Sequence, residues 1–325
     1  MIKSQRIEFI DLAKGICILL VVAGHCGFPI EIPGYEIVRM PLYFTLSGLF
    51  FKDYGGKINF LYKKTNKLLI PFLFFYLLGC IFYYTLKWLS PNMLITASTG
   101  ILDLFNNRQF FNGPIWFLLC LFWCNIIFYL IHSFAKSNKT KLLFTILCGF
   151  IGWYLGYCDI FVPLFIDVAL TALPLFAFGY FLKRSNILIK NKYDHYNLIF
   201  AVILWAISYI LYLTTTHRLS LHYNKVEGWS TFLIAISSVL SILLLCKSIK
   251  HVPIISYLGR YSIVLLCVHH LINRPLTVAF SKLPFISSYK IEVLTFSTIL
   301  ISAICIPIFK RYLPWFIAQK DLIKR

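Results

Sequence analysis

Ten apolar segments of roughly bilayer-spanning length alternate along the chain with short polar segments. Only helices and closed barrels satisfy the backbone in lipid, so runs this long predict membrane-spanning helices. The second segment is short, and the fifth and sixth are separated only by the residues around Cys158-Asp159. We therefore predict an all-α transmembrane bundle of about ten helices, over residues 9–28, 37–52, 68–89, 114–134, 141–157, 162–182, 197–213, 229–248, 256–274 and 290–310.

The basic residues are divided unevenly between the polar segments. Both ends of the chain and the even-numbered gaps between predicted helices are basic, as at Lys136, Lys139 and Lys141, whereas the odd-numbered gaps carry fewer lysines and arginines. Basic loops remain on the cytoplasmic side of a membrane. The pattern predicts that both termini are cytoplasmic, and an even number of helices agrees. No linker interrupts it, so a single membrane domain is expected over residues 1–325.

Composition supports contact with lipid. Hydrophobic residues make up 59% of the chain and charged residues only 13%, against about a quarter charged in an average soluble domain. The net charge of +19 raises the question of nucleic acid, but the basic residues are dispersed as loop clusters and do not form one basic surface. The expected partner is membrane lipid, with no nucleic acid.

Neither a cysteine metal site nor a cleaved signal peptide is predicted from the sequence. The ten cysteines are scattered without a CxxC pair, which favours buried thiols and no metal site. The first segment has a basic start, but Glu8, Asp11 and Lys14 interrupt the region where a cleaved signal peptide is purely apolar. It is therefore predicted to be a membrane helix.

The first predicted helix carries an unusual polar stripe. An ionisable group at membrane depth costs about 2.5–3.5 kcal/mol, so those that persist usually face a cavity. Lys14 and His25 are separated by about 20° around the helix and by about 16 Å along it, and Asp11 joins the same face. The stripe predicts a polar passage from the cytoplasmic side to the outer half of the membrane. The alternative is that Lys14 snorkels to the interface and His25 caps carbonyl groups.

Other polar residues in the apolar segments are candidates for the same passage. Arg39 begins the second helix, where Ser47-Gly48 favours plain helix packing. The cluster of Lys63, Lys64 and Lys67 is expected either to face lipid headgroups or to bind phosphates. The remaining candidates are Trp116, for which anchoring at the membrane interface is the simple account, Asp167, and the adjacent His269 and His270.

These residues also carry a resemblance to a known family. The segment Arg6-Ile-Glu-Phe-Ile-Asp11-Leu-Ala-Lys14-Gly15, followed by an apolar run to Gly24-His25, resembles the first helix of the membrane acyltransferase-3 family, in which ten residues separate a basic residue from a histidine. The chain resembles its short, stand-alone sugar O-acetyltransferases of the fucose O-acetylase-like kind. Further matching motifs, in order up to about residue 270, are Met40-Pro41-Leu-Tyr-Phe44, Ser47-Gly48, the basic run to Lys67 with Pro71, Gly113-Pro114-Ile-Trp116-Phe117, Leu173-Pro174 with Phe176 and Gly179, and Leu258-Gly259 with Ser262 and His269.

The resemblance implies a membrane O-acyltransferase. Its donor would be a cytoplasmic acyl-CoA, usually acetyl-CoA, and its acceptor a hydroxyl of a cell-surface or lipid-linked saccharide; no metal is expected. It also implies a multi-pass protein of the bacterial cytoplasmic, or inner, cell membrane. The catalytic candidates are His25, Lys14 and Asp11, and the donor-binding candidates are Lys63, Lys64, Lys67 and Arg39. The family often has arginine in place of Lys14, and lysine lacks the bidentate fork of arginine.

A mechanism follows from these candidates. Imidazole can act as a base near neutral pH, so His25 is expected to activate the acceptor hydroxyl or to carry the acyl group briefly. Lys14 and the three clustered lysines would meet the CoA phosphates, while Arg39 and Ser47 would contact the oxyanion or the acceptor. A transporter or flippase for a lipid-linked sugar or polysaccharide is the main alternative, and a membrane sensor or anchor without chemistry is the second.

Overall fold

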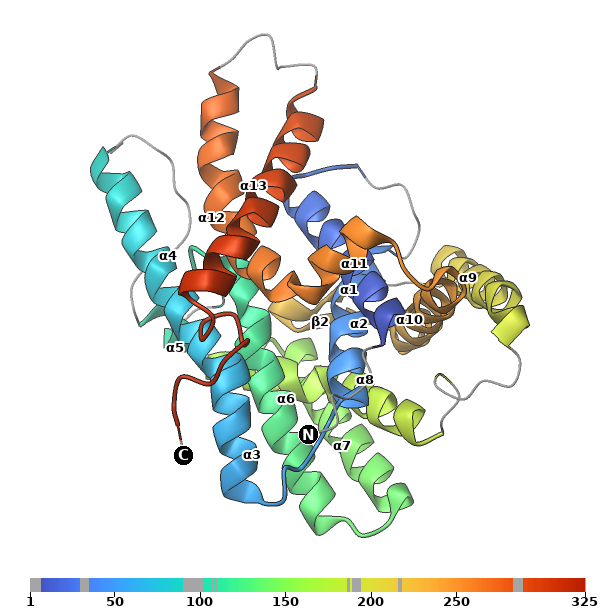
Figure 1. Ribbon diagram of the computed structural model, residues 1–325. Helices are drawn as coiled ribbons and strands as arrows, with labels where there is room; N and C mark the ends of the chain where they lie inside the picture. The colour runs from blue at the N-terminus through green and yellow to red at the C-terminus, as the bar shows by residue number, and fades with distance from the viewer. Residues whose placement is uncertain are drawn as a thin grey trace.

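The structure, a computed structural model, describes residues 7–29, 35–89, 102–106, 108, 110–185, 188, 194–215, 218–282 and 289–324. These residues form a helical bundle (Figure 1), with one short antiparallel hairpin of β1 (Arg218–Ser220) and β2 (Lys225–Glu227) in the described part of the chain. The predicted all-α class is therefore confirmed.

Eight helical segments within the described ranges are long and apolar enough to cross a membrane. α1 (Glu8–His25) and α2 (Tyr35–Leu49) fall outside this set, because α1 carries three charged residues and α2 has 15 residues. The number of spans and the side on which the termini lie remain predictions. The eight segments are α3 with η1 and α4 (Lys57–Lys64, Thr65–Leu69 and Ile70–Leu89), η2 with α6 (Gly113–Ile115 and Trp116–Phe134), α7 (Asn138–Tyr157), η3 with α8 (Pro163–Phe165 and Ile166–Arg184), α9 (Asn197–Thr214), α10 (Ser230–Ile249), α12 (Ser262–Ser281) and α13 (Lys290–Tyr312).

The predicted helix over residues 256–274 is two helices. α11 (Pro253–Arg260) ends before Tyr261, whose backbone leaves the helical region, and α12 begins at Ser262 and continues to Ser281. The break allows α11 to lie against α1. At their contact, a Cβ added at Gly259 would overlap the Asp11 carbonyl oxygen, and one added at Gly15 would overlap the Ile255 carbonyl oxygen. Close backbone approach therefore fixes α11 in this position.

A second glycine contact joins α2 to α8. A Cβ on Gly48 would overlap the Phe176 carbonyl oxygen, and a Cβ on Gly179 would overlap the Thr45 carbonyl oxygen. The packing role predicted for Gly48 is confirmed. Together, the two crossings place α1 and α2, blue in Figure 1, among α8, α10, α11 and α12 in the middle of the bundle.

Apolar side chains are divided between an internal core and the outer surface. The core is rich in aromatic residues, including Phe44, Phe117, Phe128 and Phe176. α7 and α9 instead expose many large apolar side chains, as expected of helices that face lipid. Six of the ten cysteines are buried, and three are half-buried. The prediction of buried thiols is wrong for Cys158, which is exposed where α7 ends.

The short elements complete the described chain. They lie outside the spanning helices, and the hairpin segment with η5 covers the ends of α7 and α8. These elements are α5 (Asp103–Asn106), η4 (Asp194–Tyr196) and η5 (Leu221–Tyr223).

Candidate functional site

Three histidines from two helices meet at one end of α1. His25 lies in the last turn of α1, and its ring centroid is 5.2 Å from that of His269 and 4.9 Å from that of His270, both on α12. One ring nitrogen of each histidine lies within 4.8 Å of one ring nitrogen of each of the other two. His25, His269 and His270 are called the histidine cluster below. Asn273 Nδ2 donates a hydrogen bond of 3.2 Å to the His25 carbonyl oxygen and ties α12 to this end of α1.

A backbone carbonyl group fixes one of the two α12 imidazoles. His269 Nδ1 lies 2.7 Å from the Leu265 carbonyl oxygen, so Nδ1 carries the proton and Nε2 presents a lone pair. Both His269 Nε2 and His270 Nδ1 are buried without a hydrogen-bond partner in the described structure. His269 is fully buried, whereas His25 is exposed and forms the open side of the cluster.

The surroundings of the histidine cluster are basic. The groups that act electrostatically on His25 include His269, His222 and the guanidinium groups of Arg39 and Arg274. The Arg39 guanidinium lies against Gly24, the residue before His25. The Arg274 guanidinium lies 4.8 Å from the centre of the Phe111 ring. Such a site favours negative charge, including the oxyanion that forms in acyl transfer.

The predicted polar passage along α1 is interrupted. Lys14 lies far from His25 along the helix, with Nζ 5.6 Å from the centre of the Phe50 ring. Ile18 and Val21 lie between them on the same face, are only 0% and 3% exposed, and belong to the aromatic core. The expectation of a continuous polar stripe was therefore wrong, because these aliphatic side chains fill the face between its two ends. Asp11 stays near Lys14, and its carbonyl oxygen packs against Gly259.

The candidate donor-binding residues lie in two places. Arg39 lies beside Gly24 at the histidine cluster. Lys63 Nζ instead lies 2.5 Å from Asp321, and Lys67 Nζ lies 3.9 Å from the same carboxylate and 2.5 Å from the Ala318 carbonyl oxygen. Lys64 is buried, with Nζ 5.6 Å from the centre of the Phe60 ring.

The C-terminal segment thus occupies part of the lysine cluster. Beside it lies a cavity of about 570 Å³, lined by Tyr54, Asn59, Tyr62, Lys63, Asp321 and Lys324. This cavity is open to the outside and has basic side chains in its lining, so its chemistry suits a phosphate group.

Ser47, the remaining candidate on α2, lies beside the α2–α8 crossing, next to Gly48.

A second polar network lies close to the histidine cluster. Asp167 is fully buried and forms an ion pair with Arg108, with a second contact of 3.4 Å between Arg108 Nη1 and Asp167 Oδ1. Asn224 Nδ2 donates to Asp167 at 3.2 Å, and Thr171 donates to Asn224 Oδ1 at 2.7 Å. Arg108 therefore balances the charge of Asp167, and the sequence alone did not predict this pairing.

His222 connects this network to Trp116. The His222 ring stacks on Trp116 with ring centroids 5.4 Å apart and on Phe165 at 5.7 Å, and its Nε2 donates to the Arg108 carbonyl oxygen at 2.6 Å. Burial lowers the pKa of His222 to about 4, so this imidazole is neutral at pH 7. Trp116 is only 6% exposed. The interpretation of Trp116 as an interface anchor is wrong, because its ring is used for internal stacking.

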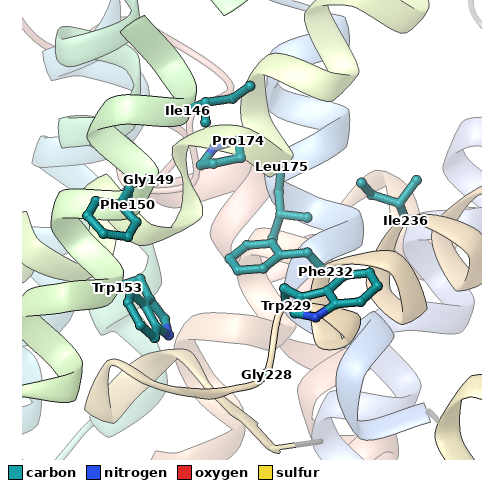
Figure 2. A pocket seen from close by; sticks show the side chains of 10 residues that line it. All are labelled: Ile146, Gly149, Phe150, Trp153, Pro174, Leu175, Gly228, Trp229, Phe232 and Ile236. Atoms are coloured by element: carbon teal, nitrogen blue, oxygen red, sulfur yellow. The ribbon is translucent and has the colours of Figure 1, made fainter. Parts of the chain in front are cut away.

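A separate apolar groove lies on another side of the bundle. Its volume is about 550 Å³, and its lining comes from α7, α8, α10 and the residues just before α10. Figure 2 shows Trp153 and Trp229 on opposite sides of it, with Pro174 and Leu175 between the helices. The lining has no ionisable side chain. The groove offers apolar contact but no group that could catalyse acyl transfer.

Sequence reasoning found His25, His269, His270 and Arg39 one by one but missed their assembly. Arg274 and His222 were not selected as site residues at all. The adjacent histidines inside an apolar run were the available signal. The expectation of no metal rested on the cysteines and did not consider the three histidines together.

The fold and the site define a multi-pass membrane protein in which basic and imidazole groups meet between helices. The chain belongs to the acyltransferase-3 family: the family model described as an acyltransferase domain matches residues 7–311. That range contains α1 and α12, which carry the histidine cluster, and α2, which carries Arg39. The resemblance noted from the sequence motifs is confirmed. No curated protein and no solved structure matches the chain.

Proposed function

We propose that this membrane acyltransferase moves an acetyl group, or another short acyl group, from cytoplasmic acyl-CoA to a hydroxyl of a cell-surface or lipid-linked saccharide. Membership of the family supports acyl transfer. The observation that carries the assignment to a site is the histidine cluster, because it joins an exposed imidazole to buried lone pairs and nearby guanidinium groups.

The chemistry uses His25 as the acid–base group. The acceptor oxygen attacks the thioester carbonyl carbon, while its proton moves to the imidazole. The C–S bond of the tetrahedral intermediate then breaks, and the proton passes to the departing thiolate of CoA. If His25 carries the acyl group instead, its ring nitrogen first bonds to the carbonyl carbon as the C–S bond breaks and the thiolate of CoA leaves. The acceptor oxygen then bonds to the same carbon as the C–N bond breaks, and its proton goes to the thiolate by way of the released imidazole. Arg39 and Arg274 supply positive charge for the oxyanion.

The donor has to reach this site from the cytoplasmic side. Lys63 and Lys67, beside the open cavity, are the proposed contacts for the phosphates of CoA. Ile18 and Val21 block a direct path along α1. Delivery of the acyl group along this face therefore requires α1 and its neighbours to separate there, as lids and packed helices do in other enzymes.

The test is consumption of acetyl-CoA by purified protein with a saccharide acceptor, together with mass spectrometry of surface glycans from cells with and without the chain. His25→Ala should abolish the acetyl mass increment at unchanged protein abundance. His251→Ala is the matched control, because His251 is exposed and lies outside the site. Full activity of His25→Ala would reject this residue as the catalytic group. Movement of a glycan across the membrane without thioester cleavage would instead identify a transporter.

A further inference from the structure

We propose that His25, His269 and His270 bind one divalent transition-metal ion of the zinc type. Three neutral imidazoles are the protein ligands of some catalytic zinc sites, which keep a fourth position open for a reacting group. This inference goes beyond acyl transfer and does not depend on which saccharide is the acceptor. Its basis is the convergence of three ring nitrogens within 4.8 Å of one another.

His269 is already oriented as a metal ligand, and the neighbouring His270 presents an unpartnered ring nitrogen. In metal sites, a ligating imidazole typically donates its other ring N–H to a carbonyl or carboxylate, which fixes the tautomer. His269 does this through Nδ1 to the Leu265 carbonyl oxygen. His269 Nε2 and His270 Nδ1 are buried and lack a partner in the described residues. A buried lone pair without a partner is costly, so a ligand is expected there.

The third ligand can complete the site with a small movement. Zinc–nitrogen bonds of about 2.0–2.1 Å place the nitrogens of a tetrahedral site about 3.3 Å apart. The three nitrogens, now within 4.8 Å of one another, therefore have to move closer together, and we assign this movement to the His25 side chain. His25 is exposed and lies in the last turn of α1, so its side chain has room to turn toward the other two.

The chemistry of the donors selects the class of metal. Imidazole nitrogen suits zinc, copper, iron and nickel, whereas magnesium and calcium require oxygen ligands. The cluster contains no carboxylate. Arg39 and Arg274 lie near His25 and oppose a bare dication. A metal in this site is therefore best balanced by an anionic fourth ligand, such as a deprotonated hydroxyl or a developing oxyanion.

The metal would change the role of His25 in the proposed reaction. If the metal binds, His25 would be one of its ligands, and the group would supply Lewis-acid chemistry to the reaction. Arg39 and Arg274 would keep the role of stabilising the negative oxygen. This arrangement accounts for three imidazoles and two guanidinium groups gathered at one site.

The experiment uses the full chain without a histidine tag, purified in detergent, stripped with a chelator and titrated with Zn²⁺ or Co²⁺. We expect one equivalent of zinc by mass spectrometry of the metal, and a Co²⁺ visible spectrum typical of a four-coordinate site. His269→Gln and His270→Gln should each weaken binding at least tenfold. The matched controls His195→Gln and His251→Gln, both on exposed residues, should bind as the original protein does.

If a cluster variant fails to fold, the site is tested by X-ray absorption of the unsubstituted protein loaded with zinc. That spectrum should show scattering from imidazole ligands. Binding well below one equivalent, or equal binding by the cluster variants and the controls, would overturn the metal site. Stoichiometric zinc without any acyl transfer would leave the metal site standing and reject the proposed reaction. If fully metal-free protein transfers acyl groups and binds no zinc, the proposed reaction stands and the metal site is rejected.

Discussion

The Arg39 guanidinium occupies the space that a side chain on Gly24 would fill. Nη1 of Arg39 lies against the bare backbone of α1 at this position, and a Cβ there would overlap it. Because Gly24 precedes His25, the contact holds a positive charge beside the histidine cluster. A side chain at Gly24 would therefore displace the Arg39 guanidinium from its place beside the site.

Gly24→Ala should displace the Arg39 guanidinium and lower kcat by about tenfold or more, since loss of one oxyanion-stabilising donor typically costs about 10²–10³-fold. Arg39→Ala should lose at least as much. Arg39→Lys should recover part of the rate, because it keeps the charge but not the fork. Turnover of acetyl-CoA in detergent checks this, with the thermal unfolding midpoint as a control for folding. Unchanged kcat in both Gly24→Ala and Arg39→Ala would remove Arg39 from the reaction.

The buried ion pair between Arg108 and Asp167 should dominate the stability of the hairpin side of the bundle. Removing one member of a buried pair typically costs about 3–5 kcal/mol, so Asp167→Asn should lower the thermal unfolding midpoint strongly. Lys225 and Asp159 form a matched surface pair, in which Asp159 is 79% exposed. Asp159→Asn should cost no more than about 1 kcal/mol. Equal shifts for the two variants would show that the Arg108–Asp167 pair contributes little.

The sequence predicted individual helices well, but it did not predict how the helices pack against one another. Hydrophobic length alone located the apolar segments, and the small residues of Ser47-Gly48 correctly indicated a helix crossing. The spacing of Lys14 and His25 correctly gave a shared face, but spacing carries no information on what packs between them, and Ile18 and Val21 close that face. Contacts between distant segments, such as His25 with His269, follow from tertiary packing, which periodicity does not encode.

The same limit explains the residues that were missed. His222 lies in a polar segment between two helices, where a histidine is unremarkable until it stacks on Trp116. Arg274 looked like a loop charge because the helix was expected to end there, but α12 continues to Ser281. The helix break at Tyr261 depends on the approach of Gly259 to α1, which only the folded chain reveals.

The lysine cluster yields a prediction about the donor. If Lys63 and Lys67 bind the phosphates of acyl-CoA, Lys63→Ala and Lys67→Ala should each raise KM for acetyl-CoA about tenfold, the usual effect of losing a charge-assisted hydrogen bond. kcat should change little. Asp321→Asn should lower KM, because it removes the carboxylate that pairs with both lysines.

The matched control for this series is Lys57→Ala, since Lys57 is exposed at the start of α3. Initial rates over a range of acetyl-CoA concentrations give both constants. An unchanged KM in both lysine variants would place the donor elsewhere and leave these side chains with the structural role of holding the C-terminal segment.

His222 should make stability depend on pH. Burial lowers its pKa in the folded protein to about 4, below the value of about 6.5 expected in the unfolded chain. The folded state therefore favours neutral His222, and this contribution is fully present above about pH 6.5 and is lost as the pH falls toward 4. The loss should reach at most about 3 kcal/mol. Thermal unfolding midpoints measured from pH 7 to pH 4 should fall steeply for the original protein.

His222→Gln should flatten that dependence, because glutamine can still donate to the Arg108 carbonyl oxygen but does not gain a proton. Its midpoint at pH 7 should be somewhat lower, since the aromatic stack with Trp116 and Phe165 is lost. His251→Gln, on an exposed histidine, should keep the pH profile of the original protein. A profile equally steep in His222→Gln would assign the acid sensitivity to other groups and would remove His222 as its source.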